Sequence, residues 1–264
     1  MIQLGEFQQL IVDRDTSVGF FLRDIDNTED VLLPNKYIEE DMKIGDTIRV
    51  FVYNDSEDRM VATTEVPHIT LNKFAFLHVQ EVNQVGAFLD WGLEKQLLVP
   101  FKNQPRNLEE GKRYLIYLYE DLDSDRLVGT AKVDQYLKKT AEENELEEGQ
   151  KVDLLVKQIT DLGATVIINQ EILGIVYQSD IFDNIYVGDQ LTGYVQKIRE
   201  DFKVDVSLQP IGVASIEPNA QKIKNALQKN NGFLAVSDKS NPEEIKARFQ
   251  MSKKLFKKAI GSLY

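Results

Sequence analysis

The chain has 264 residues, of which 42% are hydrophobic and 28% are charged. It carries 31 Lys and Arg against 43 Asp and Glu, and the resulting net charge of −12 disfavours a general nucleic-acid binder. The absence of cysteine excludes disulfides, thiol catalysis and cysteine-based zinc sites. No apolar run approaches the roughly 18 residues of a membrane helix and no secretory signal pattern is present, so we expect a cytoplasmic protein without a cofactor.

The same short pattern recurs three times along the chain. Each copy has a first glycine that opens an apolar stretch, a second glycine 25 or 26 residues later, and a basic residue 14 or 15 residues further on. In chain order the three sets are Gly19, Gly45 and Arg59; Gly86, Gly111 and Arg126; and Gly163, Gly188 and Lys203. Internal repetition at matched spacing predicts a tandem array of one structural unit.

Each copy consists of short apolar stretches bounded by turn residues. Residues 47–53, 113–119 and 190–198 are the strand-like stretches that follow the second glycine. About five strands in about 65 residues, without helical periodicity, predict a small closed β-barrel. The first glycine of each copy suits a bend or bulge where the sheet turns a corner. The predicted barrels span residues 1–66, 67–138 and, with a linker, 139–210.

The linker before the third barrel is predicted to be helical. The first glycines lie 67 residues apart in the first interval and 77 in the second, so about ten residues are added between the second and third copies. Residues 134–149 place Leu137, Ala141 and Leu146 among Lys and Glu, and Gly149 is a helix-stop signal. We interpret the carboxylates of residues 142–148 as solvated charge rather than as a catalytic pair.

The charge is distributed unevenly. Residues 1–66 carry −9, residues 67–138 carry −1 and residues 139–210 carry −8, whereas residues 211–264 hold 10 basic and 4 acidic residues, a net +6. A basic segment attached to an acidic body suggests contact with nucleic acid.

The basic segment has the 3.6-residue period of helices. A first helix should end near residues 230–232, a second should begin at residues 240–244, and Ser252 should cap a third over residues 253–264. The third helix gathers four lysines on one side, Lys253, Lys254, Lys257 and Lys258. This layout is typical of a helix-turn-helix that enters a DNA groove, and the alternative is a small helical domain whose lysines only face water. A winged version would continue into two more strands, so either the sequence is cut at Tyr264 or the wing is missing.

These motifs resemble known families. Residues 85–90, Val-Gly-Ala-Phe-Leu-Asp, followed by residues 97–100, Leu-Leu-Val-Pro, are similar to the S-one (S1) domain, an OB-fold RNA-binding unit. Three such modules with a C-terminal winged-helix-like segment resemble the conserved virulence factor B family of bacterial RNA-binding regulators. The resemblance implies a mainly β fold with some α: three tandem five-stranded OB-fold barrels of S1 type followed by a winged-helix-like domain at residues 211–264.

The family binds RNA through aromatic residues on the second and third strands and a basic residue near the last strand. Carried over residue by residue, this implies single-stranded RNA as the partner. The implied RNA-binding residues are Phe21, Phe88 and Tyr177 as aromatics, Arg59, Arg126 and Lys203 as cations, and the four lysines of the last helix. Of the adjacent Phe20 and Phe21, the family pattern favours Phe21 outward. Trp91, the only tryptophan, is expected to pack or to line a boundary between modules.

Nothing in the sequence indicates an enzyme or a metal site. The two histidines, His68 and His78, lack a zinc-binding spacing, and there is no phosphate-binding loop or nucleophile turn. The first hypothesis is therefore a cytoplasmic RNA-binding regulator. The alternatives are a protein-interaction adaptor whose acidic modules dock a basic partner, and a protein that binds DNA through its last helix.

Overall fold

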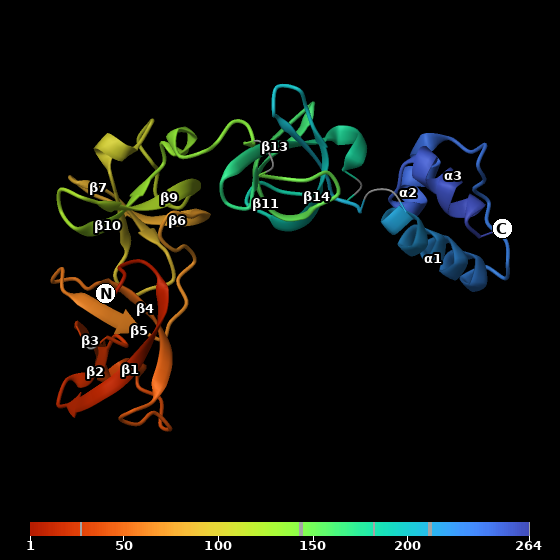
Figure 1. Ribbon diagram of the computed structural model, residues 1–264. Coiled ribbons are helices and arrows are strands. Elements are labelled where there is room, and N and C mark those ends of the chain that lie inside the picture. Colours follow the sequence, from red (N-terminus) through yellow and green to blue (C-terminus); the bar gives the residue numbers. More distant parts are fainter. Residues whose placement is uncertain (27, 143–144, 182, 211–212, 264) are drawn as a thin grey trace. The chain divides into compact units, whose positions relative to one another are not determined.

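The computed structural model describes residues 1–26, 28–142, 145–181, 183–210 and 213–263, with the backbone alone for residues 213–218. Three five-stranded β units are followed by three helices (Figure 1), which confirms the predicted fold class. Contacts divide the chain into two compact units, Met1–Tyr136 and Leu137–Tyr264. The first unit holds two of the β units, and the second holds the third β unit and the helices.

Barrel 1 is a closed barrel with the strand order β1-β2-β3-β5-β4. Its strands are β1 (Phe7–Thr16), β2 (Gly19–Arg23), β3 (Asp30–Pro34), β4 (Thr47–Asn54) and β5 (Met60–Thr63), with a short 3-10 turn η1 (Asn35–Tyr37) after β3. Alternation along the strands sends apolar side chains such as Leu22, Leu33 and Val50 inward, where each is fully buried.

Barrel 2 repeats this arrangement but is an open five-stranded sheet, in the order β10-β9-β6-β7-β8. Its strands are β6 (Phe74–Val82), β7 (Gly86–Asp90), β8 (Leu97–Pro100), β9 (Arg113–Asp121) and β10 (Arg126–Thr130), with η2 (Phe101–Asn103) after β8. No ladder joins β8 to β10 among the described residues. The two strands nevertheless pack together, because a Cβ at Gly129 would lie 2.8 Å from Val99 Cγ2.

Barrel 3 is closed, in the order β11-β12-β13-β15-β14. Its strands are β11 (Lys151–Thr160), β12 (Gly163–Ile168), β13 (Ile172–Tyr177), β14 (Gln190–Ile198) and β15 (Val204–Ser207), with η4 (Gln178–Asp180) after β13.

The linker before barrel 3 is irregular, a series of bends and turns, so the helix predicted over residues 134–149 is wrong for the part that is described; residues 143–144 lie outside it. The short turn η3 (Val133–Gln135) is followed by a chain that pairs with barrel 3. The Lys138 N–H donates to the Glu171 carbonyl, and the Lys138 carbonyl accepts from the Leu173 N–H. Leu137, Ala141 and Leu146 are buried. These contacts with the barrel override the local preference for helix.

The first glycine of each repeat begins the second strand and lies against the end of the third. A Cβ at Gly19, Gly86 or Gly163 would lie 2.1, 2.4 or 2.1 Å from the carbonyl oxygen of Leu33, Val99 or Val176. Bulges lie instead in the first strands, beginning at Val12, Val79 and Val156, and in β14, beginning at Val195. The prediction of a bend or bulge at these glycines is therefore wrong: the glycine is required because two backbones approach closely.

We expect Gly86→Ala to destabilise barrel 2 by about 2–3 kcal/mol, because the new methyl group meets a backbone carbonyl that cannot move independently of its sheet. Gly111→Ala is the matched control: its φ is +77°, but nothing lies within 4 Å of a new Cβ. The control should lose only about 1 kcal/mol. Peptide-resolved hydrogen exchange in β6–β10 compares both variants with wild type, and equal losses of protection would contradict the close-approach explanation.

The C-terminal domain contains α1 (Val213–Lys229), α2 (Pro242–Phe249) and α3 (Lys253–Gly261). The predicted caps are confirmed: the Asn241 side chain accepts from the Glu243 N–H, and the Ser252 hydroxyl accepts from the Leu255 N–H. Ile223, Ile245, Phe249 and Phe256 form its core. No strand is found among residues 213–263, and residue 264 lies outside the described range. None of the helices described is both long and apolar enough to span a membrane.

Candidate nucleic-acid interface

Barrel 2 brings two of the predicted RNA-binding residues into one cavity. Phe88 lies on the outer side of β7, because its neighbours Ala87 and Leu89 are fully buried in the core. Arg126 begins β10, which packs beside β8. Both side chains line a cavity of about 460 Å³, which we call the junction pocket. An aromatic ring and a cation in one cavity can stack a base and hold its phosphate.

The rest of the junction pocket comes from both barrels of the first unit. Barrel 2 adds residues of β7, β8, β10 and the β7–β8 loop, whereas barrel 1 adds Asn54, Ser56 and Asp58 at the β4–β5 turn. The Asn54 Oδ1 atom is buried and has no hydrogen-bond partner among the described residues. The wall of the pocket therefore contains polar residues of barrel 1 together with the aromatic residue Phe88 of barrel 2.

Trp91 fixes the two barrels to each other, which confirms the expectation that it lines a module boundary. Its side chain is 2% exposed and meets Phe51 and Tyr53 of barrel 1 edge-on, with ring centroids 5.9 and 6.2 Å apart. Phe51 and Tyr53 belong to the same hydrophobic core as barrel 2. Burial, together with the nearby Tyr37 hydroxyl, raises the pKa of Tyr53 far above its ordinary value. The junction is thus an apolar core continuous across two barrels.

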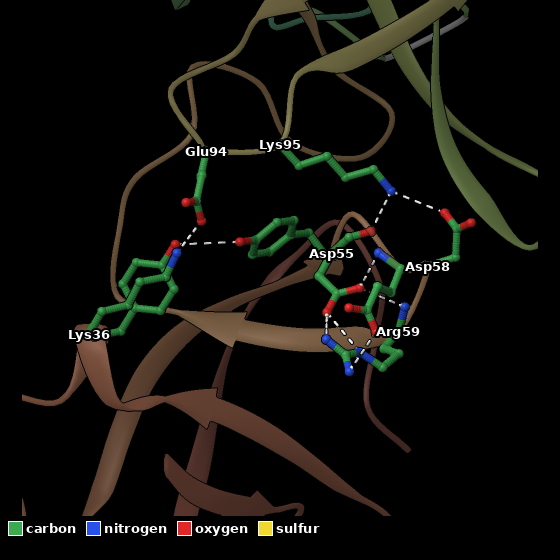
Figure 2. A network of polar contacts seen from close by, with 9 residues as sticks. Lys36, Asp55, Asp58, Arg59, Glu94 and Lys95 are labelled. Atoms are coloured by element: carbon green, nitrogen blue, oxygen red, sulfur yellow. Dashed lines mark hydrogen bonds and ion pairs between the residues drawn. The ribbon is translucent and has the colours of Figure 1, made fainter. Parts of the chain in front are cut away.

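Polar contacts also join the two barrels, and Figure 2 shows those of Lys36 with Glu94 and of Lys95 with Asp55 and Asp58. Lys36 of barrel 1 pairs with Glu94 of barrel 2. The Lys95 ammonium donates to the Asp55 carbonyl at 2.6 Å and to Asp58 Oδ1 at 3.1 Å. Asp58 Oδ2 also lies 2.6 Å from Arg126 Nη2. One carboxylate of barrel 1 therefore contacts two cations of barrel 2.

Barrel 1 has an aromatic residue on its outer face, but a cation covers the ring. Phe20 is buried and Phe21 is half-buried, as the family pattern predicts. The Arg14 guanidinium lies 4.2 Å from the Phe21 ring centroid and pairs with Asp13 and Asp30. Access to Phe21 requires Arg14 to leave the ring or to take part in the stack.

The predicted cation of barrel 1 is also paired. Arg59 contacts Asp55 at 2.6 Å and Glu57 at 2.9 Å, both within its own turn. In barrel 1, therefore, Phe21 is covered by Arg14 and Arg59 is paired within its own turn, whereas Phe88 and Arg126 line one pocket in barrel 2.

Barrel 3 pairs its aromatic residue with a cation that the sequence analysis missed. Arg199, directly after β14, donates from Nη2 to the Tyr177 hydroxyl at 2.5 Å and from Nε to Asp205 at 2.9 Å. The hydrogen bond to Asp205 raises the pKa of Arg199 above its ordinary value. The predicted cation, Lys203, pairs instead with Asp201 at 2.7 Å. The repeat contains a signal for this position. Arg199 lies four residues before Lys203, as Asp55 lies four residues before Arg59, and a backbone hydrogen bond joins each pair across the hairpin turn.

The helical domain presents its lysines as predicted. On α3, Lys254, Lys257 and Lys258 are exposed and Lys253 is half-buried, whereas Phe256 and Ala259 on the other side are fully buried. No ion pair of these four lysines is found among the described residues. They form an exposed basic surface.

Comparisons with known proteins agree with this architecture. The S1 domain family model matches residues 4–65, and the CvfB-like winged helix domain model matches residues 221–264. The uncharacterized protein YitL of Bacillus subtilis is 31% identical over 98% of this chain and 88% of its own length. Conserved virulence factor B of Staphylococcus saprophyticus is 27% identical over 90% of this chain and 82% of its own length.

A solved structure is also similar in sequence. It is described as a multidomain protein with nucleic acid binding domains from Streptococcus pneumoniae, is 28% identical, and covers 98% of this chain and 93% of its own, with a TM-score of 0.43.

The barrels and the helical domain define a protein of tandem OB-fold barrels, beginning with an S1 domain and ending in a winged-helix domain. OB folds of this kind bind single-stranded nucleic acid on one face. On the whole-length similarity and the two domain matches, the chain belongs to the conserved virulence factor B family.

Proposed function

We propose that this protein is a cytoplasmic, non-catalytic regulator that binds single-stranded RNA, with the junction pocket of barrel 2 as its principal site. The observation that carries the proposal is the shared pocket of Phe88 and Arg126. A base stacked on an aromatic ring contributes about 1–3 kcal/mol, and the guanidinium holds the adjacent phosphate. Single-stranded RNA is the ligand this chemistry fits, because unpaired bases can reach a ring that duplex bases cannot.

The basic surface of α3 is proposed as a second, weaker contact. Its lysines provide charge for phosphates, without an Arg, Asn or Gln among them to read base edges. Weak sites joined in one chain bind more tightly together than either does alone. The proposed division of work is base stacking at the junction pocket and phosphate attraction at α3.

The direct test is a fluorescence anisotropy titration of the whole chain. The probe is a labelled oligouridine of about twelve nucleotides, within the range that OB folds accommodate. Unlabelled duplex DNA and single-stranded RNA are then added as competitors at two salt concentrations. The proposal predicts stronger competition by the single strand. No binding at low salt would overturn it, and binding of a basic protein that survives nuclease treatment would favour the adaptor alternative.

Replacing Lys253, Lys254, Lys257 and Lys258 by alanine is expected to weaken oligouridine binding and reduce its salt dependence. Each phosphate contact with a single strand contributes about 0.7 to the slope of log K against log salt, so the slope should fall by up to about 3. The control replaces Lys222, Lys224, Lys229 and Lys239, which removes the same charge from the same domain. Equal effects in both variants would mean that net charge, rather than the α3 surface, is responsible.

A further inference from the structure

The β4–β5 turn of barrel 1 forms ion pairs with cations of barrel 2 that the proposed RNA site needs to bind phosphate. In each barrel the cation near the last strand has an acidic partner, but the partners of Arg59 and Lys203 come from their own turns. The described partner of Arg126 is Asp58, which belongs to the other barrel. Asp58 also contacts Lys95 (Figure 2).

The Asp58 carboxylate lies where a phosphate would have to lie. Its two oxygens contact Arg126 at 2.6 Å and Lys95 at 3.1 Å, and Asp58 and Arg126 both line the junction pocket together with Phe88. A carboxylate and a phosphate oxygen are alternative acceptors for the same guanidinium and ammonium donors. A phosphate entering beside Asp58 must displace it and also meets its negative charge at short range.

The turn that presents Asp58 is ordered by Asp55. The Asp55 side chain accepts from the backbone N–H groups of Glu57 and Arg59, and from the Arg59 guanidinium at 2.6 Å. Partial burial opposes ionisation of Asp55, but these hydrogen bonds outweigh it and hold its pKa below the ordinary value. The packing of Trp91 on Phe51 and Tyr53 holds the turn beside barrel 2, so Asp58 competes at a high effective concentration.

The ion pair between Asp58 and Arg126 is weak enough for a ligand to displace it. The side chains of Asp58 and Arg126 remain 38% and 52% exposed, and exposed ion pairs are weak. A short or weakly held anion is therefore excluded, whereas an RNA strand that also stacks on Phe88 can displace the carboxylate.

We infer that Asp58 is an intramolecular competitor of phosphate, and that through it barrel 1 limits RNA binding by the junction pocket of barrel 2. The inference rests on the proposed function, because it concerns access to the same site. The inference gives a role to barrel 1, whose net charge is −9, in an RNA-binding protein: its negative charge weakens the binding of non-specific anionic ligands at the junction pocket.

The test compares Asp58→Asn with wild type in the anisotropy titration with labelled oligouridine. We expect binding to tighten by between about three-fold and ten-fold at low salt, because a neutral amide neither holds the two cations nor repels phosphate. Glu57→Gln is the matched control: it removes one charge from the same turn, but Glu57 pairs with Arg59 and not with barrel 2. Most of the gain should disappear in Asp58→Asn combined with Arg126→Ala.

The outcomes separate the inference from the proposed function. If wild type binds oligouridine through Phe88 but Asp58→Asn binds no more tightly than Glu57→Gln, the competitor role is wrong and the RNA site stands. Weaker binding by Asp58→Asn also overturns the inference, since it would make Asp58 a residue that positions Arg126. If wild type does not bind and Phe88→Ala changes nothing, the proposed function itself fails. Circular dichroism melting checks that each variant is folded.

Discussion

Replacing Phe88 by alanine is expected to weaken oligouridine binding by between about 5-fold and 150-fold, with little change in stability. The range corresponds to the loss of about 1–3 kcal/mol for one stacked base. Phe88 is half-buried on the outer side of β7, so its removal leaves the core residues Ala87 and Leu89 in place. Anisotropy titration at constant salt measures the effect, and Phe88→Tyr should retain most of the affinity because it keeps an aromatic face.

The matched control for this variant is Phe101→Ala. Phe101 is also an aromatic residue of barrel 2, and its side chain is 40% exposed in η2, but it does not line the junction pocket. A comparable loss of affinity in Phe101→Ala would show that general surface hydrophobicity, rather than stacking in the pocket, determines binding. A loss confined to Phe88→Ala supports the pocket.

Replacing Trp91 by alanine is expected to produce the largest loss of stability, about 3–5 kcal/mol in the first unit, because it removes a buried aromatic side chain from a continuous core. The indole N–H also donates to the Lys95 carbonyl at 2.5 Å, so the β7–β8 loop loses its anchor. Hydrogen exchange resolved by peptide is the suitable measurement, since a single midpoint is poorly defined in a protein of several domains.

The exchange pattern distinguishes a junction effect from a general one. Protection should fall in β4 and β7, on the two sides of the junction, and remain in β11–β15, which belong to the second compact unit. Phe233→Ala is the control, because Phe233 is an aromatic residue with 72% exposure. Trp91→Phe should restore part of the protection. An unchanged exchange pattern in Trp91→Ala would contradict the assignment of Trp91 as the residue that joins the barrels.

The repeat could be predicted from sequence because the glycines that mark it are required by contacts with a neighbouring strand of the same barrel. Gly19, Gly86 and Gly163 recur since each lies within van der Waals distance of a neighbouring strand, and any side chain would collide. The starts of α2 and α3 could be predicted for the same reason, because the N-capping side chains of Asn241 and Ser252 bond to backbone N–H groups two or three residues further along the chain. Short-range requirements of this kind leave a signal that a single sequence displays.

The linker and the acidic partners could not be predicted, because they depend on contacts distant in sequence. Residues 134–149 have a helical pattern, yet Lys138 pairs with the barrel around Ile172. The contact of Asp58 with Arg126 depends on how two barrels dock, which neither repeat encodes by itself. Arg199 acquires its role only when a hairpin places it beside Tyr177 and Asp205. The sequence therefore indicated which residues form the candidate binding face of each barrel, but not which cations on that face are already paired with a carboxylate.

The position of Trp91 has a practical consequence. It is the only tryptophan of the chain, and it lies at the contact between barrels 1 and 2, on the wall of the junction pocket. Its fluorescence therefore reports one place in the molecule without any label. Emission characteristic of an apolar environment marks the docked state, and a red shift marks separation of the two barrels. The chain thus contains its own optical reporter for the contact between barrels 1 and 2.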